Sequence, residues 1–87
     1  MRKGKTETGF EFELDDEVLD DYELLEVLHK VDQGDYGYVP EMVDRLLGEK
    51  QKEALKEHVR STNGKVSAKA MMDEVALIFE ANKELKN

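Results

Sequence analysis

The sequence predicts a mainly α-helical single domain over residues 1–87, a small orthogonal bundle of about four helices with a short extended N-terminal segment at residues 9–14. Apolar residues recur at three- and four-residue spacing in four stretches, the period of an amphipathic helix. Glycine, proline and an Asn-Gly pair interrupt these stretches. One earlier segment instead alternates apolar and acidic residues, as a half-buried strand does. Short connections between the helices favour a bundle.

The N-terminal part divides into a polar start and the extended segment. Residues 1–8 are polar, and we expect them to be flexible. The next segment runs Gly9-Phe10-Glu11-Phe12-Glu13-Leu14, and its period of two places the apolar residues on one side. A lone strand must lie across the helices or pair with another copy or a partner. We expect Phe10, Phe12 and Leu14 to cover the core of the bundle, with contact to a partner as the alternative.

The first helix is predicted at about residues 19–33, with an extra turn at 15–18. Asp20 with Glu23 three positions later resembles a capping box. Gly34 is a suitable stop after the last apolar position. The predicted inner stripe consists of Val18, Leu19, Tyr22, Leu25, Leu28 and Val31, widened by Leu24 and Val27.

Three further helices follow at short intervals. Pro40 suits the first position of a second helix, because the N–H that proline lacks would be unpaired there. Gly48 ends that helix after about two turns, and a third runs over about 49–62. Ser67 can cap a fourth at about 68–85. The predicted inner positions are Val39, Met42, Val43, Leu46, Leu47, Ala54, Leu55, His58, Val59, Ala70, Met71, Val75, Ile78 and Phe79.

Charge and composition restrict the class of partner. The chain has 21 acidic and 13 basic residues, a net charge of −8. This balance disfavours nucleic acid and anionic membranes and favours a basic protein surface. There is no cysteine. No apolar run reaches the roughly 20 residues that span a bilayer, and the basic start has no apolar segment behind it. We expect a cytoplasmic protein without disulfides.

No pattern typical of catalysis or of a bound cofactor is present. His29 and His58 lie on different predicted helices, and neither has a second histidine three or four residues away. The Asn63-Gly64 turn fails as a calcium loop, because Val59 and Ala70 would occupy the positions that need carboxylates. We therefore expect no enzyme, no metal and no cofactor. Four acids could hold a hard cation weakly, but we favour a solvated face and helix caps: Asp15, Asp16, Asp20 and Asp21.

The same reasoning selects residues for contact with a protein partner. Tyr36 and Tyr38 flank Gly37 in a turn, and exposed aromatic residues often anchor interfaces. A marginally stable domain of this size would also gain from a partner or from self-association as a homo-oligomer. The candidate partner-binding residues are Tyr36, Tyr38, Phe10, Phe12, Asp15, Asp16, Asp20 and Asp21.

Four short motifs follow one another before a last helix that carries Glu74 and Ile78-Phe79. They are Thr8-Gly9-Phe10-Glu11-Phe12-Glu13-Leu14-Asp15, Asp20-Asp21-Tyr22-Glu23-Leu24-Leu25, Leu46-Leu47-Gly48-Glu49-Lys50-Gln51 and Asn63-Gly64-Lys65-Val66. This order, over about residues 8–80, resembles the small tail assembly chaperones of long-tailed bacteriophages and prophages. The resemblance implies a non-enzymatic protein of the host cytoplasm that binds the tape-measure protein and tail-tube subunits and is absent from the finished tail. In many such phages a programmed frameshift adds a C-terminal extension.

Two other classes of function stay open. A head–tail connector or adaptor subunit would form a ring and persist in the mature particle. A small regulator would bind DNA or another regulator, with a short reading helix over about 49–62. Acids at 49, 53 and 57 interleave with the polar and basic residues of that helix, which disfavours DNA. Those residues are Lys50, Gln51, Lys52, Lys56 and Arg60.

Overall fold

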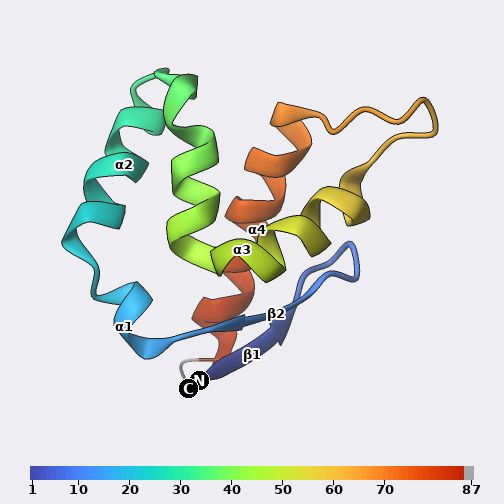
Figure 1. Cartoon of the computed structure of the whole chain (residues 1–87). Helices are drawn as coiled ribbons and strands as arrows, with labels where there is room; N and C mark the ends of the chain where they lie inside the picture. Colours follow the sequence, from blue (N-terminus) through green and yellow to red (C-terminus); the bar gives the residue numbers. More distant parts are fainter. Residues whose placement is uncertain (86–87) are drawn as a thin grey trace.

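A computed structural model describes residues 1–85, with side chains described through residue 82. The described chain is mainly helical and begins with a β-hairpin (Figure 1). The predicted fold class is confirmed. In chain order the elements are β1 (Arg2–Lys5), β2 (Glu11–Leu14), α1 (Asp16–Leu19), α2 (Tyr22–Asp32), the 3-10 turn η1 (Tyr36–Tyr38), α3 (Val39–Val59) and α4 (Ala68–Leu85).

The hairpin supplies the partner that the predicted strand needed. β1 and β2 are antiparallel, with Lys3 opposite Glu13 and Lys5 opposite Glu11. These opposite charges on the solvent face stabilise the register. A turn closes the hairpin through hydrogen bonds between Thr6 and Phe10. The expectation that residues 1–8 are loose is therefore wrong for β1, which becomes ordered by its backbone pairing with β2 rather than by an apolar pattern of its own.

The first predicted helix divides into α1 and α2. The Asp21 carboxylate, not that of Asp20, caps α2, because it accepts hydrogen bonds from the backbone N–H groups of Glu23 and Leu24 at 2.9 and 3.2 Å. The predicted Asp20–Glu23 capping box is thus replaced by a simple side-chain cap at Asp21, because Leu24 at the third helical position has no polar group to bond back. Asp15 caps α1 in the same way, at 3.0 Å from the N–H of Glu17.

The inward face of α2 also differs from the predicted stripe. Leu24 and Val27, predicted at its margin, are buried, whereas Tyr22 and Leu25 are 71% and 55% exposed. Six residues from Tyr22 to His29 are neither Glu23 nor Glu26, and they cannot all face inward on one helix. The docking of α2 on α3 therefore selects one side. The other side faces away from the core.

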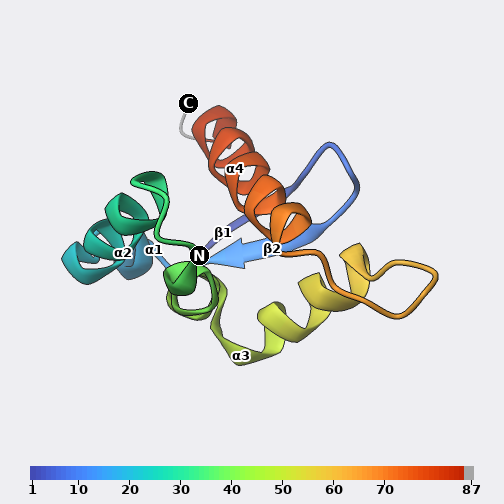
Figure 2. The same ribbon diagram turned by 90° about the horizontal axis from the view of Figure 1, so that it is seen from above.

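Gly48 divides α3 into two helical halves, as the sequence predicted for two separate helices. Its backbone has φ 79° and ψ 169°, a region that is essentially restricted to glycine. Figure 2 shows the first half of α3 nearly end-on, with the second half running away from it toward the 60–67 loop. The second half ends at Val59, three residues earlier than predicted, and Ala54 and His58 are exposed rather than inner.

The fourth helix begins as predicted. The Ser67 hydroxyl accepts a hydrogen bond from the N–H of Ala70 at 3.1 Å and caps α4. The core lies where the hairpin, α2, both halves of α3 and α4 meet. Its buried apolar residues are Phe10, Phe12, Leu14, Leu24, Val27, Val39, Met42, Val43, Leu46, Leu47, Leu55, Met71, Val75 and Ile78.

Helix length and hydropathy also bear on membranes. None of the helices in the described part of the chain combines the length and the apolar character needed to cross a bilayer.

Candidate protein-binding groove

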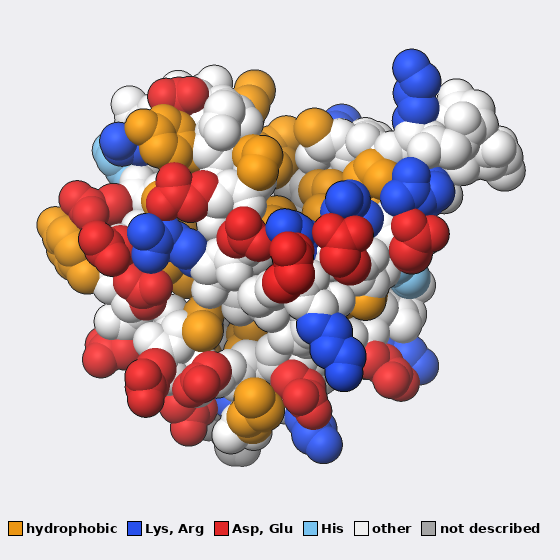
Figure 3. All heavy atoms as spheres, viewed as in Figure 1, with side chains coloured by type: hydrophobic (Ala, Val, Ile, Leu, Met, Phe, Trp, Pro, Cys, Tyr) orange, Lys and Arg blue, Asp and Glu red, His pale blue; other side chains and the backbone are white. Residues whose placement is uncertain are grey.

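An apolar groove opens between the two halves of α3 and the start of α4. Its volume is about 380 Å³. In Figure 3, hydrophobic side chains gather in the hollow between the end of the molecule that carries η1 and the protruding 60–67 loop. We call this the Tyr36 groove, and its lining residues are Tyr36, Val39, Pro40, Val43, Lys52, Lys56, Val66, Ala68 and Met71.

The bend at Gly48 creates the groove. Without it, the second half of α3 would continue along the axis of the first and would not turn to form the opposite wall. A Cβ atom built on Gly48 meets no atom within 4 Å, so the requirement for glycine is the positive φ alone and not crowding. A local backbone property therefore sets the shape of the surface.

An ion-pair network holds the two halves of α3 at this bend. The ammonium of Lys52, after the bend, lies 2.7 Å from a Glu49 carboxylate oxygen and 3.0 Å from one of Asp44, before the bend. Hydrogen bonds to Glu49 and then Asp44 raise the pKa of Lys52 well above its usual range. Lys56 is likewise paired with Glu53 at 3.3 Å. The lysine stems can thus line an apolar wall while their charges are neutralised at the rim.

The two tyrosines of η1 have different surroundings. Tyr36 is 60% exposed and lines the groove. Tyr38 is partly buried and packs against the core, and its hydroxyl accepts a hydrogen bond from Lys30 at 3.2 Å. This hydrogen bond is the main reason that the pKa of Lys30 is raised. Of this pair, Tyr36 is the one available to a partner.

The other candidate residues lie away from the groove. Phe10 and Phe12 are 6% and 2% exposed and belong to the core, so the alternative in which they contact a partner is not supported. The four acids lie at the ends of α1 and at the start of α2, at the opposite end of the molecule from η1 (Figure 1). Asp15 and Asp21 are the helix caps described above, and Asp16 pairs with Arg2 at 3.3 Å. These acids and Tyr36 do not form one site.

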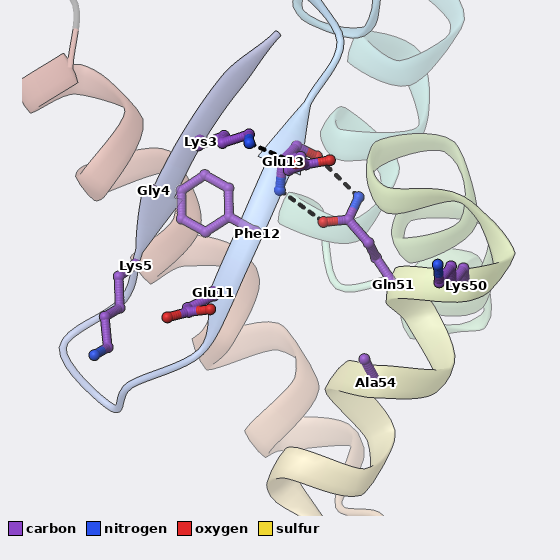
Figure 4. A pocket seen from close by; sticks show the side chains of 9 residues that line it. All are labelled: Lys3, Gly4, Lys5, Glu11, Phe12, Glu13, Lys50, Gln51 and Ala54. Atoms are coloured by element: carbon purple, nitrogen blue, oxygen red, sulfur yellow. Dashed lines mark hydrogen bonds and ion pairs between the residues drawn. The ribbon is translucent and has the colours of Figure 1, made fainter.

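A larger depression of about 670 Å³ lies beside the hairpin (Figure 4). Gln51 closes it on one side, because its amide accepts from the N–H of Glu13 at 2.7 Å and donates to the Glu13 carbonyl at 2.8 Å. This amide takes the place of a neighbouring strand and protects the edge of β2. Lysine and glutamate side chains alternate around the depression, so charges of one sign do not converge there. We interpret it as the seam between the hairpin and α3.

A buried polar cluster joins the hairpin to the helices, and sequence reasoning did not find it. Glu74 is 4% exposed, and its two carboxylate oxygens accept hydrogen bonds from Thr6 at 3.2 Å and Thr8 at 2.7 Å. The Nε2 atom of His58 lies 3.0 Å from the Thr8 hydroxyl. The Thr8 hydroxyl donates its single hydrogen to Glu74, so it accepts the hydrogen bond from Nε2 of His58. No sequence signal links a threonine at position 8 with a glutamate 66 positions later.

The cluster does not extend into a metal site. Within the described residues, no group of three or more histidine, aspartate or glutamate side chains is placed to hold an ion. The Glu74 oxygens are both satisfied by hydroxyl groups, which fits a carboxylate that fastens the hairpin tip to α4.

Comparison with known proteins adds no relative. The chain matches no family model, and no curated protein or solved structure is significantly similar to it. Function is therefore inferred from the surface and from the sequence motifs.

Proposed function

We propose that this protein is a non-enzymatic binding domain that takes an apolar segment of another protein into the Tyr36 groove. The observation that carries the proposal is an apolar groove of about 380 Å³ with a 60% exposed tyrosine at its wall. Sites for small molecules span about 300–1,000 Å³, so this groove suits a few side chains rather than a large ligand. An amphipathic helix that inserts one or two apolar residues fits this shape.

The resemblance of residues 8–80 to phage tail assembly chaperones gives the proposal its specific form. We propose that the partner is the tape-measure protein, a long helical chain, and that tail-tube subunits join the same complex. The groove supports this assignment because repeated apolar helical segments could enter it one after another. The neutralised rim around Lys52 and Lys56 supports it too, since an apolar segment meets no unpaired charge there.

Co-expression with the tape-measure protein of the same phage or prophage tests the proposal. We expect a soluble complex on pull-down and size exclusion, with the tape-measure protein insoluble when it is expressed alone. Tyr36→Ala should weaken the complex about tenfold, the effect of losing one aromatic anchor. Glu7→Ala, which changes an exposed residue in the turn between β1 and β2 and lies outside the groove, is the control and should leave the complex intact.

Two results would contradict the proposal. No gain in solubility of the tape-measure protein would remove the chaperone function for this domain. A complex that Tyr36→Ala leaves unchanged would remove the groove as its binding site. Formation of a stable ring by the domain alone would instead favour the head–tail connector.

A further inference from the structure

A second apolar surface lies on the outward side of α2, away from the Tyr36 groove. Tyr22 is 71% and Leu25 is 55% exposed. Leu25, Leu28 and Phe79, together with His29 and Asp32, line a shallow depression of about 450 Å³ between α2 and α4. We define the α2 face as Tyr22, Leu25, Leu28 and Phe79.

The α2 face lies on the side of α2 that does not pack into the core. α2 carries two apolar stripes, and the stripe with Leu24 and Val27 is the one that turns inward. Single exposed apolar residues are ordinary on protein surfaces. On the α2 face, Tyr22 and Leu25 are exposed, and Leu28 and Phe79 are partly buried against the core. Neighbouring apolar side chains around a depression are typical of interaction sites.

Acidic side chains surround the α2 face. Glu26 follows Tyr22 by one helical turn, and Asp32 lines the depression itself. Among the residues whose side chains the structure describes, the nearby cations are already engaged. Lys30 contacts the ring and hydroxyl of Tyr38, and Arg45 pairs with Glu41, Asp21 and Glu23. Figure 3 shows hydrophobic side chains at the α2 edge of the molecule with acidic side chains above and below them.

This charge pattern selects the kind of occupant. A second copy would bring the same acids against the face, and a chain with a net charge of −8 would repel it. We propose that the α2 face binds a basic amphipathic helix of another protein. Leucine or aromatic residues of that helix would fill the depression, and flanking lysine or arginine residues would meet Glu26 and Asp32. This binding site is separate from the Tyr36 groove and does not depend on it.

NMR titration of the full-length ¹⁵N-labelled protein tests the proposal. The probe is a peptide of roughly 18 residues, about five helical turns, with leucine on one side and lysine on the other. The matched peptide replaces every lysine with glutamate. We expect the lysine peptide to shift resonances of α2 and of the Phe79 region of α4, and the glutamate peptide to bind at least tenfold more weakly. Equal binding of both peptides, or shifts spread over all acidic surfaces, would overturn the proposal.

Paired variants locate the site. Leu25→Ser should weaken the lysine peptide about tenfold, because about half of this side chain is available for burial. The double variant Glu26→Gln/Asp32→Asn should lower the affinity for the lysine peptide and reduce the salt dependence of that affinity. The control Glu7→Gln/Glu11→Gln makes an equal charge change on the hairpin and should alter neither. Tyr36→Ala should have no effect. Loss of peptide binding in Tyr36→Ala but not in Leu25→Ser would assign the peptide to the groove and overturn the proposal.

Discussion

Replacing Gly48 with alanine adds one methyl group at the bend of α3, where the backbone has φ 79° and ψ 169°. No atom lies within 4 Å of the new Cβ, so the only penalty is the conformation of the residue itself. Residues held in such a region cost about 1–3 kcal/mol. We expect Gly48→Ala to lower the free energy of unfolding by about 2 kcal/mol, which for a domain of this size lowers Tm by roughly 8–16 °C.

Urea and thermal unfolding followed by circular dichroism measure this effect. The matched control is Gly37→Ala in η1, because φ of Gly37 is not positive and an added Cβ there makes an ordinary contact at 3.5 Å with Asp35. The control should be neutral or slightly stabilising, as expected where alanine can adopt the native conformation. If α3 instead straightens in Gly48→Ala, the variant should lose binding in the Tyr36 groove. An unchanged Tm together with unchanged groove binding would refute this account of the bend.

Three further changes test the buried and surface polar groups. Glu74→Ala should lower the free energy of unfolding by about 2–4 kcal/mol in urea denaturation, because it removes two charge-assisted hydrogen bonds. The control Asp73→Ala, at the adjacent exposed position, should change this free energy by under about 1 kcal/mol. Similar losses in the two variants would contradict the role of the cluster. Asn82→Leu should raise Tm, because the buried Oδ1 of Asn82 has no hydrogen-bond partner among the described residues, and a lower Tm would show that this oxygen is satisfied. Arg60 lowers the pKa of Glu57 by hydrogen bonding, so Arg60→Met should raise that pKa toward its usual value in a ¹³C NMR titration, and no shift would disprove the pairing.

The pairing of Glu57 with Arg60 also sets the sign of a pH effect. Because the pKa of Glu57 is lowered in the folded protein, its contribution to stability is present above the unfolded pKa and is lost as the pH falls through the folded pKa. The pair lies at the surface, with the Arg60 and Glu57 side chains 36% and 68% exposed, so this contribution is small. Arg60→Met should therefore cost a small amount of stability at neutral and higher pH that disappears at acid pH, in addition to a pH-independent loss of the hydrogen bond from Arg60 to the Gly64 carbonyl at 2.8 Å.

Local sequence determined the helices and most of their ends. Gly48, Asn63-Gly64 and Ser67 act within one turn of their own position, through a positive φ, a turn and a cap. Helical spacing and charge therefore predict the fold class, and they indicate Tyr36 in its turn as an exposed aromatic residue. These properties depend on neighbours in the chain, which a single sequence displays.

Tertiary structure alone decided the surfaces. β1 has no apolar alternation, because Arg2 and Gly4 occupy the positions opposite Leu14 and Phe12, and it becomes a strand only by pairing with β2. The two apolar stripes of α2 are equivalent in sequence until α3 covers one of them. The groove likewise requires the second half of α3 to turn back toward α4. Each of these outcomes depends on contacts between residues far apart in the chain. The hydrophobic effect that drives such contacts is non-directional, so a local sequence pattern does not specify which residues will meet.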